Sequence, residues 1–429
     1  MSEKLNRLIT DLGERSTYDA ASQCSRCGYC EQACPTYVAT GQESKSGRGR
    51  NQLVRLMLEG KLKDPSEAGE ALSTCLLCGA CSTACYAHVP TADIVLEGRR
   101  MLRGKSPWLA KMLTVLLGRA PALLSVLLKI AYLLKRAGLS VLARPALRIM
   151  GLRGLAEADL HVDELPLRFL YEELRQRPNA ENPAWLYFAP CGPNYLYPRV
   201  GLATVNVLGN TLGSGRFMDN NCCGLLSYNY GDIEDARVLA KKNIARAEAL
   251  PGESAPLVGD CSSCVAHLKN YPQLFLDDAA WKERAEKFSR RVRDAVEIIN
   301  KSEIAGPKPE GVITYHESCR ACHGQGLRAS KEGLTRLCGG SFQPLEEAEV
   351  CCGGAGAFSF THPELSDEVL RRKIGAIAST RASIVLTSST SCLIQLAHGL
   401  KKYYPECQVL HLSEFAVEIL SQNGAKTRA

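Results

Sequence analysis

Short runs of hydrophobic residues alternate with longer amphipathic segments through the second half of the chain. The run AWLYFAP ends just before Cys191, and a segment with helical spacing of its apolar residues follows. The same order returns at VITYHESC, which ends in Cys319. Apolar runs bounded by turn residues are typical of buried strands, and their alternation with helices is typical of parallel sheets. The pattern predicts two α/β units, in residues 181–305 and 306–429.

The first half of the chain has helical periodicity. The segment GRGRNQLVRLMLEGKL carries an apolar stripe and predicts a helix that begins near Asn51. Further along, PALLSVLLKIAYLLKRAGLSVL predicts an amphipathic helix whose polar stripe is formed by Ser125, Lys129, Tyr132 and Arg136. No uncharged run approaches the roughly 18 residues that a membrane span needs. We expect a mostly helical domain in residues 1–105 and a helical connector in residues 106–180.

Positive charge is concentrated at the end of the first domain and in the first two thirds of this connector. Residues 99–154 contain no acidic residue and twelve basic ones, whereas the whole chain has a formal net charge of +7. A basic amphipathic helix is typical of proteins that lie on an anionic membrane surface. Packing on a partner subunit or on the core of this chain is the alternative, and a nucleic-acid partner is not expected.

Cysteine is far more frequent than usual, with 20 in 429 residues. The polar N-terminal segment MSEKLNRLITDLGERS lacks the apolar stretch of a signal peptide. We therefore expect a cytoplasmic protein, peripheral on the inner membrane, in a compartment where thiols stay reduced. Cysteines in that setting indicate metal binding more than disulfides.

Eight of the cysteines form two runs with one spacing, C-x2-C-x2-C-x3-C. This is the bacterial ferredoxin run, in which the fourth cysteine of each run binds the other cluster. One [4Fe–4S] cluster is then expected on Cys24, Cys27, Cys30 and Cys85. The second is expected on Cys75, Cys78, Cys81 and Cys34. Zinc is the alternative, but structural zinc sites favour two cysteine pairs separated by a longer loop.

Arg48 and Arg50 lie between the two runs. Their guanidinium groups are candidates for tuning a cluster potential, and a solvated loop is the equally simple alternative. Four histidines, His88, His316, His323 and His362, lie near cysteines in the sequence. For each of them, ordinary loop polarity is the simpler interpretation.

The remaining cysteines repeat at a nearly constant offset. Cys191 and Cys319 differ by 128 positions, Cys222 and Cys351 by 129, and Cys261 and Cys392 by 131. Equal shifts of three landmarks in the same strand–loop–helix setting indicate an internal duplication. In such folds ligands lie at the C-terminal ends of the strands.

The order C…CCG…CxxC resembles the cysteine-rich CCG domain, which occurs twice in heterodisulfide reductase subunits. The whole arrangement is most similar to the iron–sulfur subunit of glycolate oxidase, and also to those of lactate-utilisation and anaerobic glycerol-3-phosphate dehydrogenase complexes. Local stretches that carry the resemblance are SGRGRNQLVRLMLEGKL, CCGGAGAFSFTHPEL and CRACHGQGL. The resemblance implies an α+β multidomain fold, with a two-cluster ferredoxin domain followed by two CCG domains.

The resemblance also implies metal sites in the CCG domains, because a full motif supplies five thiolates to a non-cubane cluster in heterodisulfide reductases. The first repeat has all five, namely Cys191, Cys222, Cys223, Cys261 and Cys264. The second has four, namely Cys319, Cys351, Cys352 and Cys392, with Gln395 in the fifth position. Cys322 is a candidate substitute. Iron–sulfur clusters or zinc are both open for these sites, and buried structural cysteines are the alternative.

The implied function is that of an electron-transfer subunit in an oxidoreductase. Family members receive electrons from a flavoprotein that oxidises a 2-hydroxy acid such as glycolate or lactate, and pass them towards the quinone pool. No flavin-binding element is visible in this chain, so an FAD-containing partner is expected. The alternative is a heterodisulfide-reductase-like enzyme that reduces a disulfide at the Cys191–Cys264 site.

Overall fold

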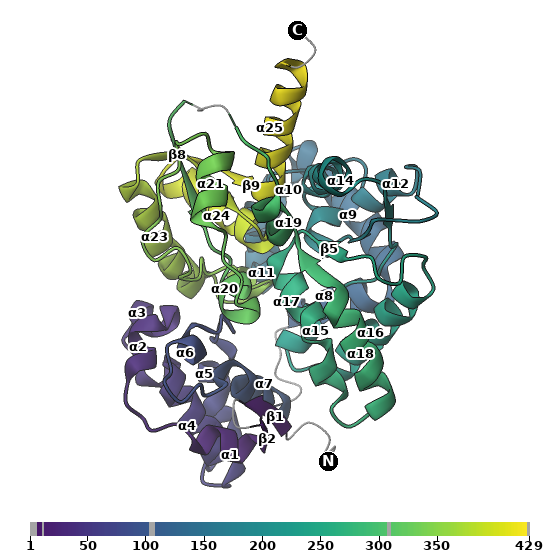
Figure 1. The fold of residues 1–429 in the computed structure, drawn as a ribbon. Helices are drawn as coiled ribbons and strands as arrows, with labels where there is room; N and C mark the ends of the chain where they lie inside the picture. The colour runs from purple at the N-terminus through teal and green to yellow at the C-terminus, as the bar shows by residue number, and fades with distance from the viewer. Residues whose placement is uncertain (1–6, 11–12, 103–107, 307–309, 427–429) are drawn as a thin grey trace.

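Three groups of elements follow one another along the chain in the computed structural model, which describes residues 7–10, 13–102, 108–306 and 310–426. A small helical domain lies below two α/β domains, and the second α/β domain is directly above it (Figure 1). The predicted α+β multidomain class is confirmed. The expected boundary between residues 105 and 106, with Arg103 and Lys105 of the basic segment, lies outside the described residues.

The N-terminal domain is built from short helices around two cysteine loops. A hairpin, β1 (Arg7–Thr10) and β2 (Gly13–Ser16), precedes them. The helices are α1 (Thr17–Ser22), α2 (Tyr29–Ala33), α3 (Pro35–Thr40), α4 (Gly47–Leu58), α5 (Gly69–Ser73), α6 (Ala80–Thr83) and α7 (Thr91–Met101), with 3-10 turns at Glu43–Lys45 and Pro65–Ala68. Val54 of α4 and Ile94 of α7 are fully buried in the core of this domain.

Helix α4 begins earlier than its apolar stripe predicts, at Gly47 and not near Asn51. The Ser46 hydroxyl caps it by accepting a hydrogen bond from the Gly49 amide at 2.9 Å. Such a cap replaces a missing intrahelical partner at the helix N-terminus. The N-cap residue marks where the helix begins, whereas the apolar stripe marks only the part that packs on the core. The stripe alone therefore does not predict the first turn of α4.

The connector consists of five helices that pack on both α/β domains. They are α8 (Trp108–Arg119), α9 (Pro121–Arg136), α10 (Leu139–Ile149), α11 (Arg153–His161) and α12 (Leu170–Leu174). The polar stripe of α9 faces the protein: Tyr132 is buried and donates to the Tyr195 carbonyl at 2.9 Å, and Lys129 pairs with Glu172 at 2.5 Å. The apolar side of α9 therefore faces outward.

We name this exposed side the outer apolar face. Its members on α9 and α10 are Leu123, Val126, Leu127, Ile130, Leu133, Leu134, Leu139, Val141, Leu142 and Ile149. The two helices pack against each other, and α10 has no buried residue among its eleven. This is the reverse of a surface helix that only covers a core.

Many of the cations in residues 99–154 are paired, although this segment contains no acidic residue. Arg119 pairs with Asp235, and Arg144 with Asp159, each at 2.5 Å. Arg99 is half-buried at a domain junction, and donates to the Cys75 carbonyl at 2.6 Å and to the Asn229 carbonyl at 2.7 Å. The acids come from outside residues 99–154, so segment composition overstates the free positive charge of this surface.

The first α/β domain has a four-stranded parallel sheet in the order β4-β3-β5-β6. The strands are β3 (Trp185–Phe188), β4 (Gly215–Phe217), β5 (Leu257–Gly259) and β6 (Val292–Asp294). The helices are α13 (Cys191–Tyr195), α14 (Pro198–Leu212), α15 (Leu225–Asn229), α16 (Ile233–Glu248), α17 (Ser262–Lys269), α18 (Ala279–Arg291) and α19 (Ala295–Lys301), with a 3-10 turn at Tyr271–Phe275. All four residues of β3 are buried, as expected of a parallel strand covered on both faces.

The second α/β domain repeats this plan. Its parallel strands β7 (Val312–His316), β8 (Ala382–Thr387) and β9 (Gln408–His411) pair in the order β7-β8-β9. An isolated parallel bridge from Ile313 to Phe342 occupies the place of β4. The helices are α20 (Cys319–Gln325), α21 (Lys331–Leu337), α22 (Phe358–Thr361), α23 (Pro363–Ser379), α24 (Thr390–Tyr403) and α25 (Leu412–Lys426). The duplication predicted from cysteine offsets is thus visible in strand order.

Among the residues that the structure describes, no helix combines the length and the apolar character needed to cross a bilayer.

Candidate iron–sulfur sites

A cavity opens where the second cysteine run meets the end of the first. Cys34, Cys75, Cys78 and Cys81 line it, and its empty volume is about 350 Å³. These are the four cysteines that the sequence predicts for one cluster. Soft thiolates gathered around a hollow form the donor set that iron–sulfur clusters use. The residues present therefore fit such a group.

The other predicted set is Cys24, Cys27, Cys30 and Cys85, and the thiols of Cys30 and Cys24 interact. Cys24 and Cys85 both pack against the core of the N-terminal domain, while Cys27 is exposed. Gly47 separates the two sets. A Cβ atom placed there would lie 2.9 Å from Cys81 Cβ and 3.3 Å from Cys30 Sγ. The start of α4 thus has no space for a side chain between the two runs.

Arg50 is 1% exposed and lies beside a cluster cysteine. Its guanidinium donates to the Ala71 carbonyl at 2.8 Å and to the Thr36 hydroxyl at 3.1 Å, and approaches Cys34 Sγ at 3.7 Å. The solvated-loop interpretation is therefore wrong for Arg50. Arg48 instead pairs with Glu31 at 2.6 Å and Glu43 at 2.8 Å.

The N-terminal domain joins the second α/β domain through its cysteines. Cys78 and Cys351 belong to one buried apolar cluster, and Cys319 packs against it. Burial, together with the Cys319 thiol nearby, holds the pKa of Cys78 well above its ordinary value. Helix α20 lies over the second cysteine loop (Figure 1), and the His323 ring nitrogen Nδ1 is 3.0 Å from the Thr83 hydroxyl.

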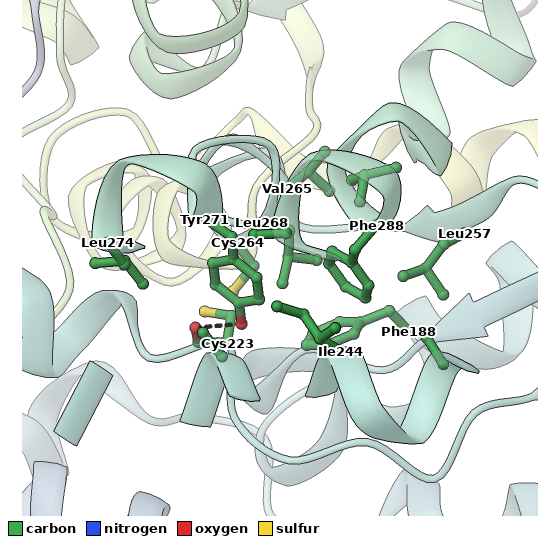
Figure 2. Close-up of a cluster of buried hydrophobic side chains, with 14 of the residues drawn as sticks. Phe188, Cys223, Ile244, Leu257, Cys264, Val265, Leu268, Tyr271, Leu274 and Phe288 are labelled. Carbon is green, nitrogen blue, oxygen red and sulfur yellow. Dashed lines mark hydrogen bonds between the residues drawn. The ribbon is translucent and has the colours of Figure 1, made fainter. Parts of the chain in front are cut away.

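The first α/β domain brings its five motif cysteines together. Cys264 interacts directly with the thiols of Cys191, Cys223 and Cys261, and Cys222 with those of Cys191 and Cys223. Figure 2 shows Cys223 and Cys264 at the edge of the domain core, beside the Tyr271 ring, whose hydroxyl donates to the Cys223 carbonyl at 2.7 Å. Hydrogen bonding from Cys264, opposed by burial, lowers the pKa of Cys261 to about 5.

The second α/β domain brings together its four motif cysteines. Cys351 interacts with the thiols of Cys319 and Cys352, and Cys352 with that of Cys392. Gln395, predicted in the fifth position, does not occupy it, because Ser389 is the N-cap of α24 as Cys261 is the N-cap of α17, which makes Ser389 the counterpart of Cys261 and Cys392 that of Cys264. Gln395 donates to the Ser366 hydroxyl at 2.9 Å. Cys322 is buried near Arg328, Glu317 and the Cys319 thiol.

A histidine not predicted as a ligand lies at this second group. One ligand atom each from His316, Cys352 and Cys392 lie within 4.8 Å of one another. The interpretation of His316 as an ordinary polar loop residue is wrong, because His316 is the last residue of a buried strand. Cys338 and Cys407, which fit neither motif, are buried in apolar clusters.

Comparison with known proteins agrees with these two kinds of site. Residues 20–89 match the family described as 4Fe-4S dicluster domain, and residues 185–269 and 313–397 both match the family described as cysteine-rich domain, or CCG. The chain is a multi-cluster iron–sulfur protein of the class that joins a ferredoxin-type domain to CCG domains.

Relatives with named roles cover most or half of the chain. A probable glycolate oxidase iron–sulfur subunit from Bacillus subtilis is 25% identical over 97% of this chain and 98% of its own length. The glycolate oxidase iron–sulfur subunit of Escherichia coli is 27% identical over 87% and 89%. Lactate utilization protein A from Exiguobacterium is 31% identical over 55% of this chain and 97% of its own length. The chain belongs to this family of CCG-domain iron–sulfur proteins.

Proposed function

We propose that this chain is the electron-transfer subunit of a flavin-dependent 2-hydroxy-acid dehydrogenase, of the glycolate or lactate type. In this role it receives electrons from an FAD-containing partner and passes them towards the quinone pool. The observation that carries the proposal is a continuous series of neighbouring thiols, from Cys30 through Cys81 and Cys78 to Cys319 and Cys351. Iron–sulfur clusters, when bound, take up and release single electrons.

The ligands proposed for the two ferredoxin-type clusters are the crossed sets. Cys24, Cys27, Cys30 and Cys85 hold one cluster, and Cys34, Cys75, Cys78 and Cys81 hold the other. The shared cavity lining supports the second set. The absence of a side chain at Gly47 supports a close approach of the two sets, since α4 begins between Cys30 and Cys81.

The CCG cysteines are proposed as further metal sites. Cys191, Cys222, Cys223, Cys261 and Cys264 supply the first, and Cys319, Cys351, Cys352 and Cys392 contribute to the second. The mutual contacts among the thiols support this assignment, because buried cysteines that serve only as apolar filling need not converge.

The outer apolar face is proposed to lie on a membrane, which places the chain on the cytoplasmic side near its quinone acceptor. Ten large apolar side chains on two adjacent helices are exposed there, a feature that marks membrane or protein contact sites. A membrane is favoured because Lys111 on α8 and Arg148 on α10 are exposed on the same connector. Cations that are already paired with acids contribute less to membrane binding, so burial of the apolar side chains supplies most of the expected affinity for the membrane.

The test is reduction by a partner. The chain is isolated anaerobically and mixed with the flavoprotein that co-purifies with it, and 2-hydroxy acids are then added. We expect the broad visible absorption of the clusters to bleach only when flavoprotein and substrate are both present. A chain that stays oxidised while the flavin is reduced would contradict the proposal.

A second candidate function is disulfide reduction at the first CCG site, favoured by the contact of five thiols there. Disulfide turnover by the isolated chain that is lost on Cys264→Ser would support it. No turnover with a reduced, fully loaded chain would exclude it.

A further inference from the structure

His316 ends strand β7, three residues before the first cysteine of the second CCG motif. Phe188 ends β3, three residues before Cys191 in the first motif. The two residues are therefore counterparts in the duplication. Phe188 packs in the same core cluster as Cys223, Cys261 and Cys264, so a side chain at this place reaches the motif cysteines.

The fifth ligand position also differs between the repeats, because the first repeat has a cysteine there and the second does not. Ser389 is the N-cap of α24 as Cys261 is the N-cap of α17, so Ser389 corresponds to Cys261 and Cys392 corresponds to Cys264. The first repeat thus pairs phenylalanine with a fifth cysteine, and the second pairs histidine with serine. Where the second repeat loses a thiol, it gains an imidazole beside the remaining thiols.

The imidazole of His316 is fully buried. Neither ring nitrogen has a hydrogen-bond partner within the part of the chain that the structure describes. Leaving such a group unsatisfied costs roughly 1–3 kcal/mol, so an unpartnered buried imidazole calls for a ligand. The site around it contains thiols, whose sulfur atoms are poor hydrogen-bond partners and good metal ligands.

The nearest candidates to share a metal with His316 are Cys352 and Cys392. Their sulfur atoms and one His316 nitrogen lie within 4.8 Å of one another, and all three residues are buried. Metal-bound histidines normally direct the other ring nitrogen to a carboxylate or backbone carbonyl. The Ala348 backbone lies beside the ring, where it accepts from the Glu317 amide at 3.1 Å.

We propose that His316 is a ligand of an iron atom in the metal group of the second CCG site, in place of the fifth cysteine. Cys319, Cys351, Cys352 and Cys392 supply the thiolates. The inference rests on the metal occupancy proposed above for this site. Exchanging a thiolate for a neutral imidazole makes the site less negative, which raises its reduction potential relative to an all-thiolate site.

The experiment uses the full chain, loaded with iron and sulfide, and compares His316→Phe with the double variant His316→Phe/Ser389→Cys. The double variant restores the residue pair of the first repeat, Phe188 and Cys261. We expect His316→Phe to lower the iron content to that of the remaining sites, and the double variant to regain it. His411→Gln is the matched control, since His411 is also a buried histidine that ends a strand of the same sheet.

Pulsed electron paramagnetic resonance supplies a readout that a merely structural role would not change. In the reduced wild-type chain we expect a strongly coupled nitrogen that shifts when histidine is labelled with the heavy isotope of nitrogen. The coupling should persist in His411→Gln and be absent from the double variant, although that variant retains its iron.

Three results would overturn the proposal. One is a nitrogen coupling that survives in the double variant, and another is stoichiometric zinc at this site in the wild-type chain. The third is about eight irons per wild-type chain, the number for two [4Fe–4S] clusters alone. That last result would leave reduction by the flavoprotein untouched, so failure of this inference and failure of the proposed function are distinguishable.

Discussion

Cys78 of the ferredoxin-type domain and Cys351 of the second CCG domain are buried in one apolar cluster. They come from segments more than half the chain apart, and their packing makes the second CCG domain the neighbour of the second ferredoxin loop. The order of the cysteine sites along the chain is therefore not their order in space. The second CCG site lies next to the cysteines of the ferredoxin-type domain, although the first CCG site comes earlier in the sequence.

The junction depends on Gly79, which has φ +86°, and where a Cβ would lie 3.0 Å from His323 Cβ. Gly28 holds the same place in the first cysteine run, with φ +90°, but faces the flexible side-chain ends of Arg48 and Glu31. Both Gly→Ala variants incur about 1–2 kcal/mol of backbone strain. Gly79→Ala should lose a further 1–3 kcal/mol, roughly, through overpacking against α20.

Thermal unfolding of the loaded chain measures this difference. Gly79→Ala is expected to unfold at a lower temperature than Gly28→Ala, and to release the second CCG domain first in limited proteolysis. Equal destabilisation by the two variants would show that α20 does not rest on the second cysteine loop.

Arg50 places a buried positive charge beside Cys34. A charge-assisted hydrogen bond of about 1.5–3 kcal/mol to a reduced cluster corresponds to roughly 60–120 mV for one electron. Arg50→Met should lower the midpoint potential of the cluster on Cys34, Cys75, Cys78 and Cys81 by an amount of this order. Arg50→Lys, which keeps the charge, should lower it less.

Potentiometric titration, monitored by low-temperature electron paramagnetic resonance, measures these midpoint potentials. Arg55→Gln is the matched control, because Arg55 is on the same helix and pairs with Glu59 at 2.8 Å. A shift in the control as large as that in Arg50→Met would assign the effect to α4 as a whole and not to the contact with Cys34.

The outer apolar face predicts vesicle binding that depends on single side chains. Leu142 is 75% exposed and Ile149 87% exposed. Burying such a side chain contributes about 1.5–3 kcal/mol, so Leu142→Glu or Ile149→Glu should weaken binding to anionic vesicles about tenfold or more. Flotation of the purified chain with vesicles measures the bound fraction.

Val238→Glu is the control, since Val238 is 49% exposed on α16 and is not part of this face. If Leu142→Glu and Ile149→Glu float like the control and the unaltered chain, the membrane is not the occupant of the face. Binding lost only when the flavoprotein is removed would assign the face to the partner subunit.

Sequence patterns predicted the large features because each has a local signal. The cysteine spacing indicates the ferredoxin runs, and the constant offsets indicate the duplication and the strand order that follows from it. The resemblance supplied the order of the domains. These signals depend on residues close together in the chain, or on repetition, and need no knowledge of tertiary contacts.

What the sequence did not predict depends on contacts between distant segments. Arg50 is buried only because the carbonyl of Ala71 and the thiol of Cys34 meet around it. Cations of residues 99–154 pair with acids from other parts of the chain, such as Asp235. His316 could have been noticed by aligning the two repeats, since histidine and serine replace Phe188 and Cys261 together.

The central claim is that the two cysteine runs hold paired clusters that exchange single electrons. A reductive titration of the anaerobically purified full chain, followed by electron paramagnetic resonance and by analysis of iron and sulfide, tests it most directly. We predict at least about eight irons per chain and, on full reduction, the broadened signal of two neighbouring [4Fe–4S] clusters in magnetic contact. A colourless chain with stoichiometric zinc and no resonance on reduction would contradict the account.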